Sequence, residues 1–211
     1  MDDVQYRKKD WRNTNQLKTP YGIKKIHVPV KKVSLETLIY DVKISYNETW
    51  EDALMNKLKE WYKQSPYYKK IVELINPTIY GKFEKLVDFN FHLNNDILSF
   101  LEIKVPIRFA SGVPRNTTDR NKRIIELCKF FGADILYDGK SAENFIDIDL
   151  FKQNGIDVVF QNYQHTPYRQ LWGPFEPYMS ILDLLMNEGE NSKEIILSSP
   201  LPELMKLSYL E

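Results

Sequence analysis

Apolar residues between positions 50 and 100 recur at the three- and four-residue spacing of amphipathic helices. Thr49-Trp50-Glu51-Asp52 has the form of a capping box, and it opens a first helix. Ser65-Pro66 restarts the chain in a second, short helix through Leu74. A third helix carries the apolar stripe Leu86, Phe89, Leu93, Ile97 and Phe100. The pattern therefore predicts a helical subregion at about residues 49–102.

Outside this subregion the pattern favours strands. Residues 23–30 alternate well enough for one strand, and residues 33–45 contain a weaker one. After Pro106 the rhythm becomes strand, helix, strand, helix, strand. The expected elements are a strand at 107–110, a helix capped near Thr117 or Thr118 and ended at Gly132, a strand at 135–137, a short helical stretch at 142–153 and a strand at 157–163. Ser180 then caps a last amphipathic helix.

Alternating strands and helices are typical of parallel strands joined by crossover helices. We therefore expect an α/β fold, with a mixed, largely parallel sheet flanked by helices. Ligands of such sheets bind beyond the carboxyl ends of the strands, which points to the loops at 111–118, 138–142 and 163–171. Without internal repeats, the chain predicts one domain over residues 1–211, with residues 190–211 as a surface tail.

Composition agrees with a single enzyme-sized domain. The 211 residues are 43% hydrophobic, which suffices for a sizeable core. No run approaches the roughly 18 apolar residues of a membrane span, and we expect no signal peptide before Asp2. The one cysteine forms no internal disulfide, so we expect a cytoplasmic protein.

Charge is balanced overall but unevenly distributed. Residues 1–32 hold nine Lys and Arg against three Asp, a surplus of six, and the remainder carries the opposite surplus. Cations beside Tyr6 and Trp11 suit phosphates and stacking. The chain as a whole is not basic, however, and it has no nucleic-acid-binding motif, so no nucleic acid partner is expected. The same cations could instead bind the diphosphate of a nucleotide sugar, which carries far fewer phosphates than a nucleic acid.

The N-terminal arm also mixes carboxylates, amides, cations and aromatic rings within a dozen positions. This mixture is a poor core but a suitable site for a polar small molecule. Alternate residues of an extended segment face the same way. The candidates are Asp3 as a catalytic residue, and for substrate binding Gln5, Lys9, Trp11 and Asn13. The structural alternative is an exposed strand edge with a solvated cationic loop.

His165 is the candidate general base. It follows a predicted strand in a polar, aromatic loop, and the unperturbed pKa of histidine lies close to working pH. Its neighbours Tyr163, Tyr168 and Gln170 are candidate substrate-binding residues. In the alternative interpretation, His165 only ties the loop down by hydrogen bonds.

The remaining chemistry is sparse. Cys128 lies on the apolar face of a predicted helix and is expected to be a buried small hydrophobe. The histidines lack metal-ligand spacing, so no dedicated metal site is predicted. A Mg²⁺ ion carried in with a diphosphate at Asp2 or Asp3 stays open. The turn at 138–141 offers backbone N–H groups to an anion. The sequence identifies no cofactor.

Several motifs occur in the order of a known family. They are Asp-Asp-Val-Gln-Tyr at 2–6, Lys-Lys-Asp-Trp-Arg-Asn at 8–13, Lys-Thr-Pro at 18–20, Val-Pro-Val at 28–30, Leu-Cys-Lys at 127–129 with Gly-Ala at 132–133, Leu-Phe at 150–151 with Gly-Ile at 155–156, Tyr-Gln-His-Thr-Pro-Tyr-Arg-Gln at 163–170, and residues 177–185. With these motifs the chain resembles the WbqC-like family over nearly its whole length. That family tends to occur among bacterial surface-polysaccharide genes. Its members usually begin with an additional strand and a Pro-Tyr-Leu-Pro-Trp-like turn, so the resemblance implies an N-terminally truncated chain.

The resemblance implies an enzyme of bacterial cell-surface polysaccharide biosynthesis of the O-antigen type. The most concrete form is a transferase that places an acyl or aminoacyl group on an amino sugar, held as a nucleotide sugar. His165 would take the proton from the attacking amine, Asp3 would orient His165 or the sugar, and the basic arm would hold phosphate. The alternative is a non-catalytic sugar- or partner-binding protein of a glycan biosynthesis complex. The oligomeric state stays open.

Overall fold

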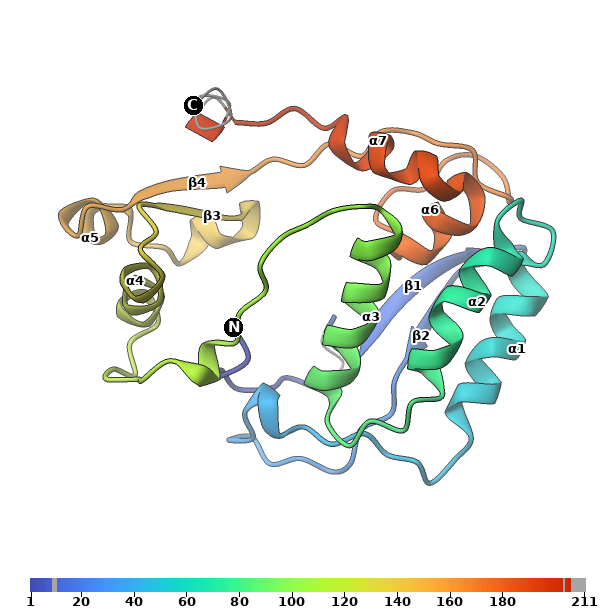
Figure 1. Cartoon of the computed structure of the whole chain (residues 1–211), viewed down its shortest axis with the longest axis horizontal. Coiled ribbons are helices and arrows are strands. Elements are labelled where there is room, and N and C mark those ends of the chain that lie inside the picture. The colour runs from blue at the N-terminus through green and yellow to red at the C-terminus, as the bar shows by residue number, and fades with distance from the viewer. Residues whose placement is uncertain (9–10, 203, 206–211) are drawn as a thin grey trace. The chain divides into compact units, whose positions relative to one another are not determined.

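The computed structural model describes residues 1–8, 11–202 and 204–205, and this part of the chain folds into helices and two small sheets (Figure 1). It divides into two compact units. The first unit comprises residues 1–107 and 165–196, and the second comprises residues 108–164 with the described residues after 196. Among the described residues, no helix has both the length and the apolar character needed to cross a membrane.

Helices dominate the first unit, as the periodicity predicts (Figure 1). The bounds are Trp50–Tyr62 for α1, Tyr68–Ile79 for α2, Leu86–Phe100 for α3, Ile181–Glu188 for α6 and Ser192–Leu197 for α7. The helical subregion at 49–102 is thus confirmed, although α2 runs beyond the predicted end and contains Pro77. Thr49 is the N-cap of α1, but its side chain makes no cap hydrogen bond. At α6, the side chain of Ser180 does accept from the backbone of Leu182, which confirms that cap.

A β-hairpin precedes these helices. Strand β1, Thr14–Thr19, pairs antiparallel with β2, Gly22–His27, in a register that sets Thr19 opposite Gly22. The tight turn places Gly22 at φ +85°, a conformation that favours glycine. The periodicity predicts β2 but misses β1, because Leu17 is the only strongly apolar residue of that strand. The C-terminal half of β1, residues 17–19, is nevertheless buried.

The predicted strand at 33–45 is wrong as a regular element. A 3-10 helix at Ile39–Asp41 interrupts it, and only isolated bridges form on either side. Residues 2–6 run along one of these sides, where Tyr6 N–H donates to Thr37 O at 2.9 Å and Ile39 N–H donates to Val4 O at 3.0 Å. The N-terminal segment is therefore paired with the chain after Thr37.

The second unit contains the predicted strand–helix–strand alternation. Strands β3, Ile135–Gly139, and β4, Asp157–Gln161, pair in parallel, and the connection between them carries α5, Ile148–Gln153. Helix α4, Arg120–Phe131, precedes β3 and ends at Gly132, whose φ of +68° closes the C-terminus. Asp119, rather than the predicted Thr117 or Thr118, is the cap of α4, since its side chain accepts from the backbone of Lys122.

The α/β class is confirmed, but the sheet is smaller than expected. One pair of strands is parallel and the other is antiparallel, and the two belong to separate sheets. In the described part of the chain, the parallel portion of the sheet is therefore the pair β3–β4 alone. The predicted strand at 107–110 is wrong, because the chain there runs into a 3-10 helix at Ala110–Gly112.

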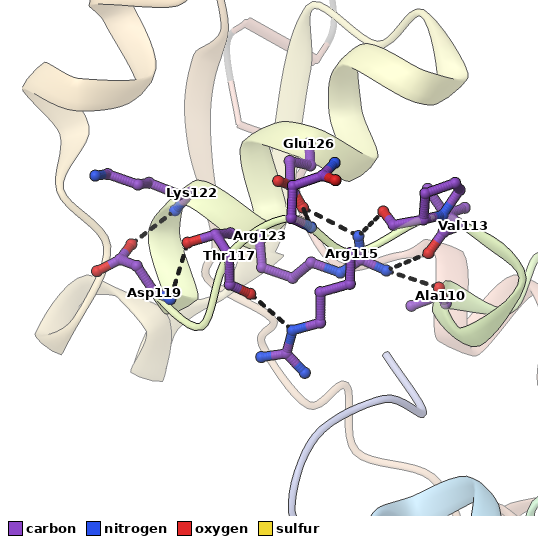
Figure 2. A network of polar contacts seen from close by, with 10 residues as sticks. Ala110, Val113, Arg115, Thr117, Asp119, Lys122, Arg123 and Glu126 are labelled. Atoms are coloured by element: carbon purple, nitrogen blue, oxygen red, sulfur yellow. Dashed lines mark hydrogen bonds and ion pairs between the residues drawn. The ribbon is translucent and has the colours of Figure 1, made fainter.

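Arg123 explains the irregular path of this segment (Figure 2). The guanidinium is 1% exposed, and it donates to the carbonyl oxygens of Ala110 at 2.8 Å, Val113 at 2.9 Å and Pro114 at 2.7 Å. It also pairs with Glu126 Oε2 at 3.1 Å. Because one side chain binds three carbonyl groups within residues 110–114, these carbonyls are satisfied without a strand partner.

We expect Arg123→Met to lower the free energy of unfolding by about 2–4 kcal/mol, since it removes the donors of buried carbonyl groups. Urea unfolding followed by circular dichroism measures the loss. Lys122→Met, at an exposed position of the same helix, is the matched control and should stay near wild type. An Arg123→Met midpoint equal to that of the control would contradict this role.

Candidate functional site

The loop of residues 165–178, which carries His165, is fixed by the side chain of Gln170. The Oε1 atom of Gln170 accepts from Lys18 Nζ at 2.9 Å and from Glu176 N–H at 2.8 Å, while Nε2 donates to Glu176 O at 3.0 Å. The amide thus pairs with the backbone of Glu176 as a neighbouring strand would. This pairing closes the irregular segment between residues 170 and 176 into a loop of defined shape.

Asp183 of α6 receives this loop. Its carboxylate is 1% exposed and accepts from Tyr62 OH at 2.5 Å, from Tyr168 OH at 2.6 Å and from Gln170 Nε2 at 2.9 Å. A buried carboxylate is tolerated only when donors satisfy it. Here the donors come from α1 and from the loop, so the carboxylate joins both to α6.

Burial raises the pKa values of Tyr62 and Tyr168, and the negative charge of Asp183 raises them further. Both phenols therefore keep their protons well above the pH at which an exposed tyrosine ionises. Their role as donors to Asp183 is correspondingly insensitive to pH around neutrality.

Lys18 of β1 supplies the opposite charge. Its buried ammonium group donates to Gln170 Oε1 and to Pro174 O. Gln170 consequently bridges a buried cation and a buried anion, since its oxygen faces Lys18 and its nitrogen faces Asp183. Compensation of this kind is what allows both charges to leave water. We call Lys18, Tyr62, Tyr168, Gln170 and Asp183 the Asp183 network.

His165 and Tyr178 lie at the two ends of the loop and contact each other. Their ring centroids are 4.3 Å apart at an interplanar angle of 67°, an edge-to-face arrangement. Burial lowers the pKa of His165 below its ordinary value. The imidazole is therefore mainly neutral near pH 7, which is the form that can accept a proton.

The other candidates of the first unit lie in varied surroundings. Asp3 is buried, Gln5 is exposed and bridges to Leu38, and Trp11 is 77% exposed with the Arg12 guanidinium 4.7 Å from its ring centroid. Asn13 donates from Nδ2 to Val28 O at 3.1 Å beside the hairpin. Lys9 lies outside the described residues.

Tyr163 belongs to the second unit, where burial raises its pKa. The structure thus brings Tyr168 and Gln170 together at Asp183. A common cleft for Asp3, Trp11 and His165, and direct substrate contacts of the candidate binding residues, stay predictions.

Sequence reasoning missed four residues of this region, namely Lys18, Tyr62, Tyr178 and Asp183. The acidic Asp183 within the apolar run at 181–186 was a usable signal, because an aspartate on the buried side of a helix needs donors from elsewhere. The other three gave no local signal, since their roles depend on partners distant in sequence.

Cys128 is buried in the core of the second unit, as predicted. Burial raises the pKa of its thiol, which disfavours the reactive thiolate. In the turn at 138–141, Asp138 Oδ1 accepts from Gly139 N–H at 2.7 Å. Within the described part of the chain, no group of three or more His, Cys, Asp or Glu residues could hold a metal ion.

Comparison with known proteins gives two matches. The model of the WbqC-like protein family matches residues 1–195. The Uncharacterized protein Rv1507c of Mycobacterium tuberculosis is 33% identical over 199 residues, which are 92% of this chain and 85% of that protein. No solved structure matches the chain.

The Asp183 network predicts a stability loss at alkaline pH. Above pH 10 the unfolded chain releases tyrosine protons that folded Tyr62 and Tyr168 keep, so their contribution to stability is full below pH 10 and declines as the pH rises further. Tyr168→Phe should make this decline shallower and cost about 1–3 kcal/mol at neutral pH. Urea unfolding between pH 8 and pH 11 measures both effects, with the exposed Tyr21→Phe as control. Equal alkaline slopes in wild type, Tyr168→Phe and Tyr21→Phe would refute the predicted pH dependence.

Cys128 should behave as a structural thiol. Cys128→Ser places a hydroxyl in an apolar site and should lower the unfolding free energy by about 1–3 kcal/mol while leaving ligand binding intact. The native thiol should also react slowly with iodoacetamide and much faster after unfolding in urea. Rapid alkylation of the native protein, or lost ligand binding at unchanged stability, would contradict this assignment.

Proposed function

Because this chain belongs to the WbqC-like protein family, we propose that it is an enzyme of bacterial cell-surface polysaccharide biosynthesis of the O-antigen type. Its reaction is the transfer of an acyl or aminoacyl group to an amino sugar held as a nucleotide sugar. The family resemblance motivates the substrate class. The observation that supports catalysis is that His165, whose pKa is lowered by burial, packs against Tyr178 on a loop fixed by the Asp183 network.

His165 acts as the general base of this reaction. As the amine of the sugar attacks the carbonyl carbon of the activated donor, the imidazole takes the proton that the amine must lose, and the bond between that carbon and the donor's leaving group breaks. A histidine with a lowered pKa remains neutral, and hence competent, at mildly acidic pH. A base on a loop held by buried hydrogen bonds also needs little reorganisation during the reaction.

The N-terminal arm supplies the binding groups. Asp3 orients either His165 or the sugar, and Gln5, Lys9, Trp11 and Asn13 contact the substrate. The cations of the arm hold the diphosphate, which accounts for a local positive surplus in a chain of zero net charge. Tyr168 and Gln170 complete the binding residues of this proposal. Its ligand is a small molecule and not a nucleic acid.

The test replaces the proposed general base, His165. His165→Gln should leave the affinity for the nucleotide sugar nearly unchanged and lower turnover by about 10²–10⁴-fold, because proton transfer stabilises the transition state rather than the bound ground state. Calorimetry and mass-spectrometric product detection, across a panel of nucleotide amino sugars with an activated acyl donor, measure the two quantities. His27→Gln, at an exposed position of β2, is the matched control and should behave as wild type.

The pH profile provides a second readout. The kcat/KM of the wild type should fall on acidification with a midpoint below pH 6.5, because protonation removes the base and burial lowers its pKa. Affinity that falls in step with activity in His165→Gln would refute a catalytic role. Tight binding without turnover in any donor and acceptor combination would instead favour the non-catalytic sugar-binding protein.

A further inference from the structure

Tyr178 combines an unfavourable backbone with an exposed ring. Its φ of +63° lies in the left-handed region, which a tyrosine rarely adopts. The side chain is nevertheless 70% exposed, so little burial of the ring compensates for this conformation. Strained residues of this kind persist where the surrounding structure imposes them, and they cluster at functional sites.

The surrounding structure does impose this conformation. Gln16 of β1 donates from Nε2 to Tyr178 O at 3.0 Å, and its own carbonyl accepts from Ser180 N–H at 2.8 Å. One residue of the hairpin thus holds the backbone on both sides of residue 179. Beyond Ser180 the chain enters α6, which the buried Asp183 anchors.

The ring of Tyr178 is largely exposed. Among the described residues, its aromatic neighbour is His165, which it meets in an edge-to-face contact. Whichever of the two rings presents its edge, at least one face of the tyrosine ring is left uncovered by this contact. An uncovered aromatic face beside a neutral imidazole is suited to a flat, partly apolar group that carries an ionisable atom.

We propose that Tyr178 is the surface on which the pyranose ring of the acceptor sugar packs, with the amine of that sugar directed at His165. This inference rests on the proposed function and names the residue that selects its acceptor. The C–H groups on one face of a pyranose pack against the aromatic face, and the substituents at the rim of the ring stay free for hydrogen bonds. Stacking of the nucleobase of the nucleotide sugar on Tyr178 is the competing outcome.

The experiment compares three probes, namely uridine diphosphate glucosamine, uridine diphosphate alone and methyl β-glucosaminide. Tyr178→Ala should weaken the first and the third by about five- to tenfold and leave uridine diphosphate unchanged, because only the sugar contact is lost. Tyr178→Phe keeps the ring and should retain wild-type affinity for all three. Tyr21→Ala, which removes an equally exposed tyrosine in the hairpin turn, is the matched control.

Tyr178→Gly separates binding from folding. Glycine adopts a positive φ without strain, so this variant should unfold at an equal or higher temperature than wild type and still lose sugar affinity. Titration calorimetry measures the affinity for the nucleotide probes, and saturation-transfer NMR measures the affinity for the free sugar. Scanning calorimetry measures the unfolding temperature.

The possible failures are distinguishable. If wild type binds uridine diphosphate glucosamine and Tyr178→Ala binds it equally, the inference is wrong while the proposed function stands. If uridine diphosphate alone loses affinity in Tyr178→Ala, the ring stacks on the base and the inference is wrong. If wild type binds none of the three probes, the proposed function fails for this acceptor class, and the inference fails with it.

Discussion

The burial of one carboxylate, that of Asp183, organises the first unit. A buried aspartate is unstable in an apolar core unless donors surround it, and α6 by itself provides none for the side chain. The donors arrive from α1 through Tyr62 and from the loop through Tyr168 and Gln170. Gln170 then links the carboxylate to the buried ammonium of Lys18 in β1. Helices α1 and α6, the hairpin and the loop therefore meet at the Asp183 network.

This arrangement explains how a segment without regular structure can carry a site. The loop has no ladder of backbone hydrogen bonds, yet its two ends place His165 and Tyr178 in contact. The second unit uses the same principle, since buried Arg123 holds the carbonyls of Ala110, at the end of the expected strand, and of Val113, in the loop after it (Figure 2). In both units a buried charged side chain replaces secondary structure as the support of a loop.

Much of the fold was predictable from local pattern, and the exceptions share one cause. The helices at 50–62 and 86–100 and the parallel strands at 135–139 and 157–161 follow from periodicity, since each buries a face of its own. Strand β1 was not predicted, because Leu17 is its one strongly apolar residue. Its other buried residues, Lys18 and Thr19, are polar, and elements distant in sequence cover them. The strand expected at 107–110 does not form. The chain there runs into a 3-10 helix, and a side chain of α4 binds the carbonyl oxygen of Ala110.

The sequence by itself determined the α/β class, the polar and aromatic composition of the loop at 163–170, and the burial of Cys128, because these follow from residue type and spacing. Only the tertiary structure decided that Gln170 joins Lys18 to Asp183, that His165 packs on Tyr178, and that Tyr178 has a positive φ. Lys18 and Gln170 lie 152 positions apart in the chain. No local pattern encodes such a pairing, since the free energy of a buried polar group depends on the partners that the whole fold brings to it.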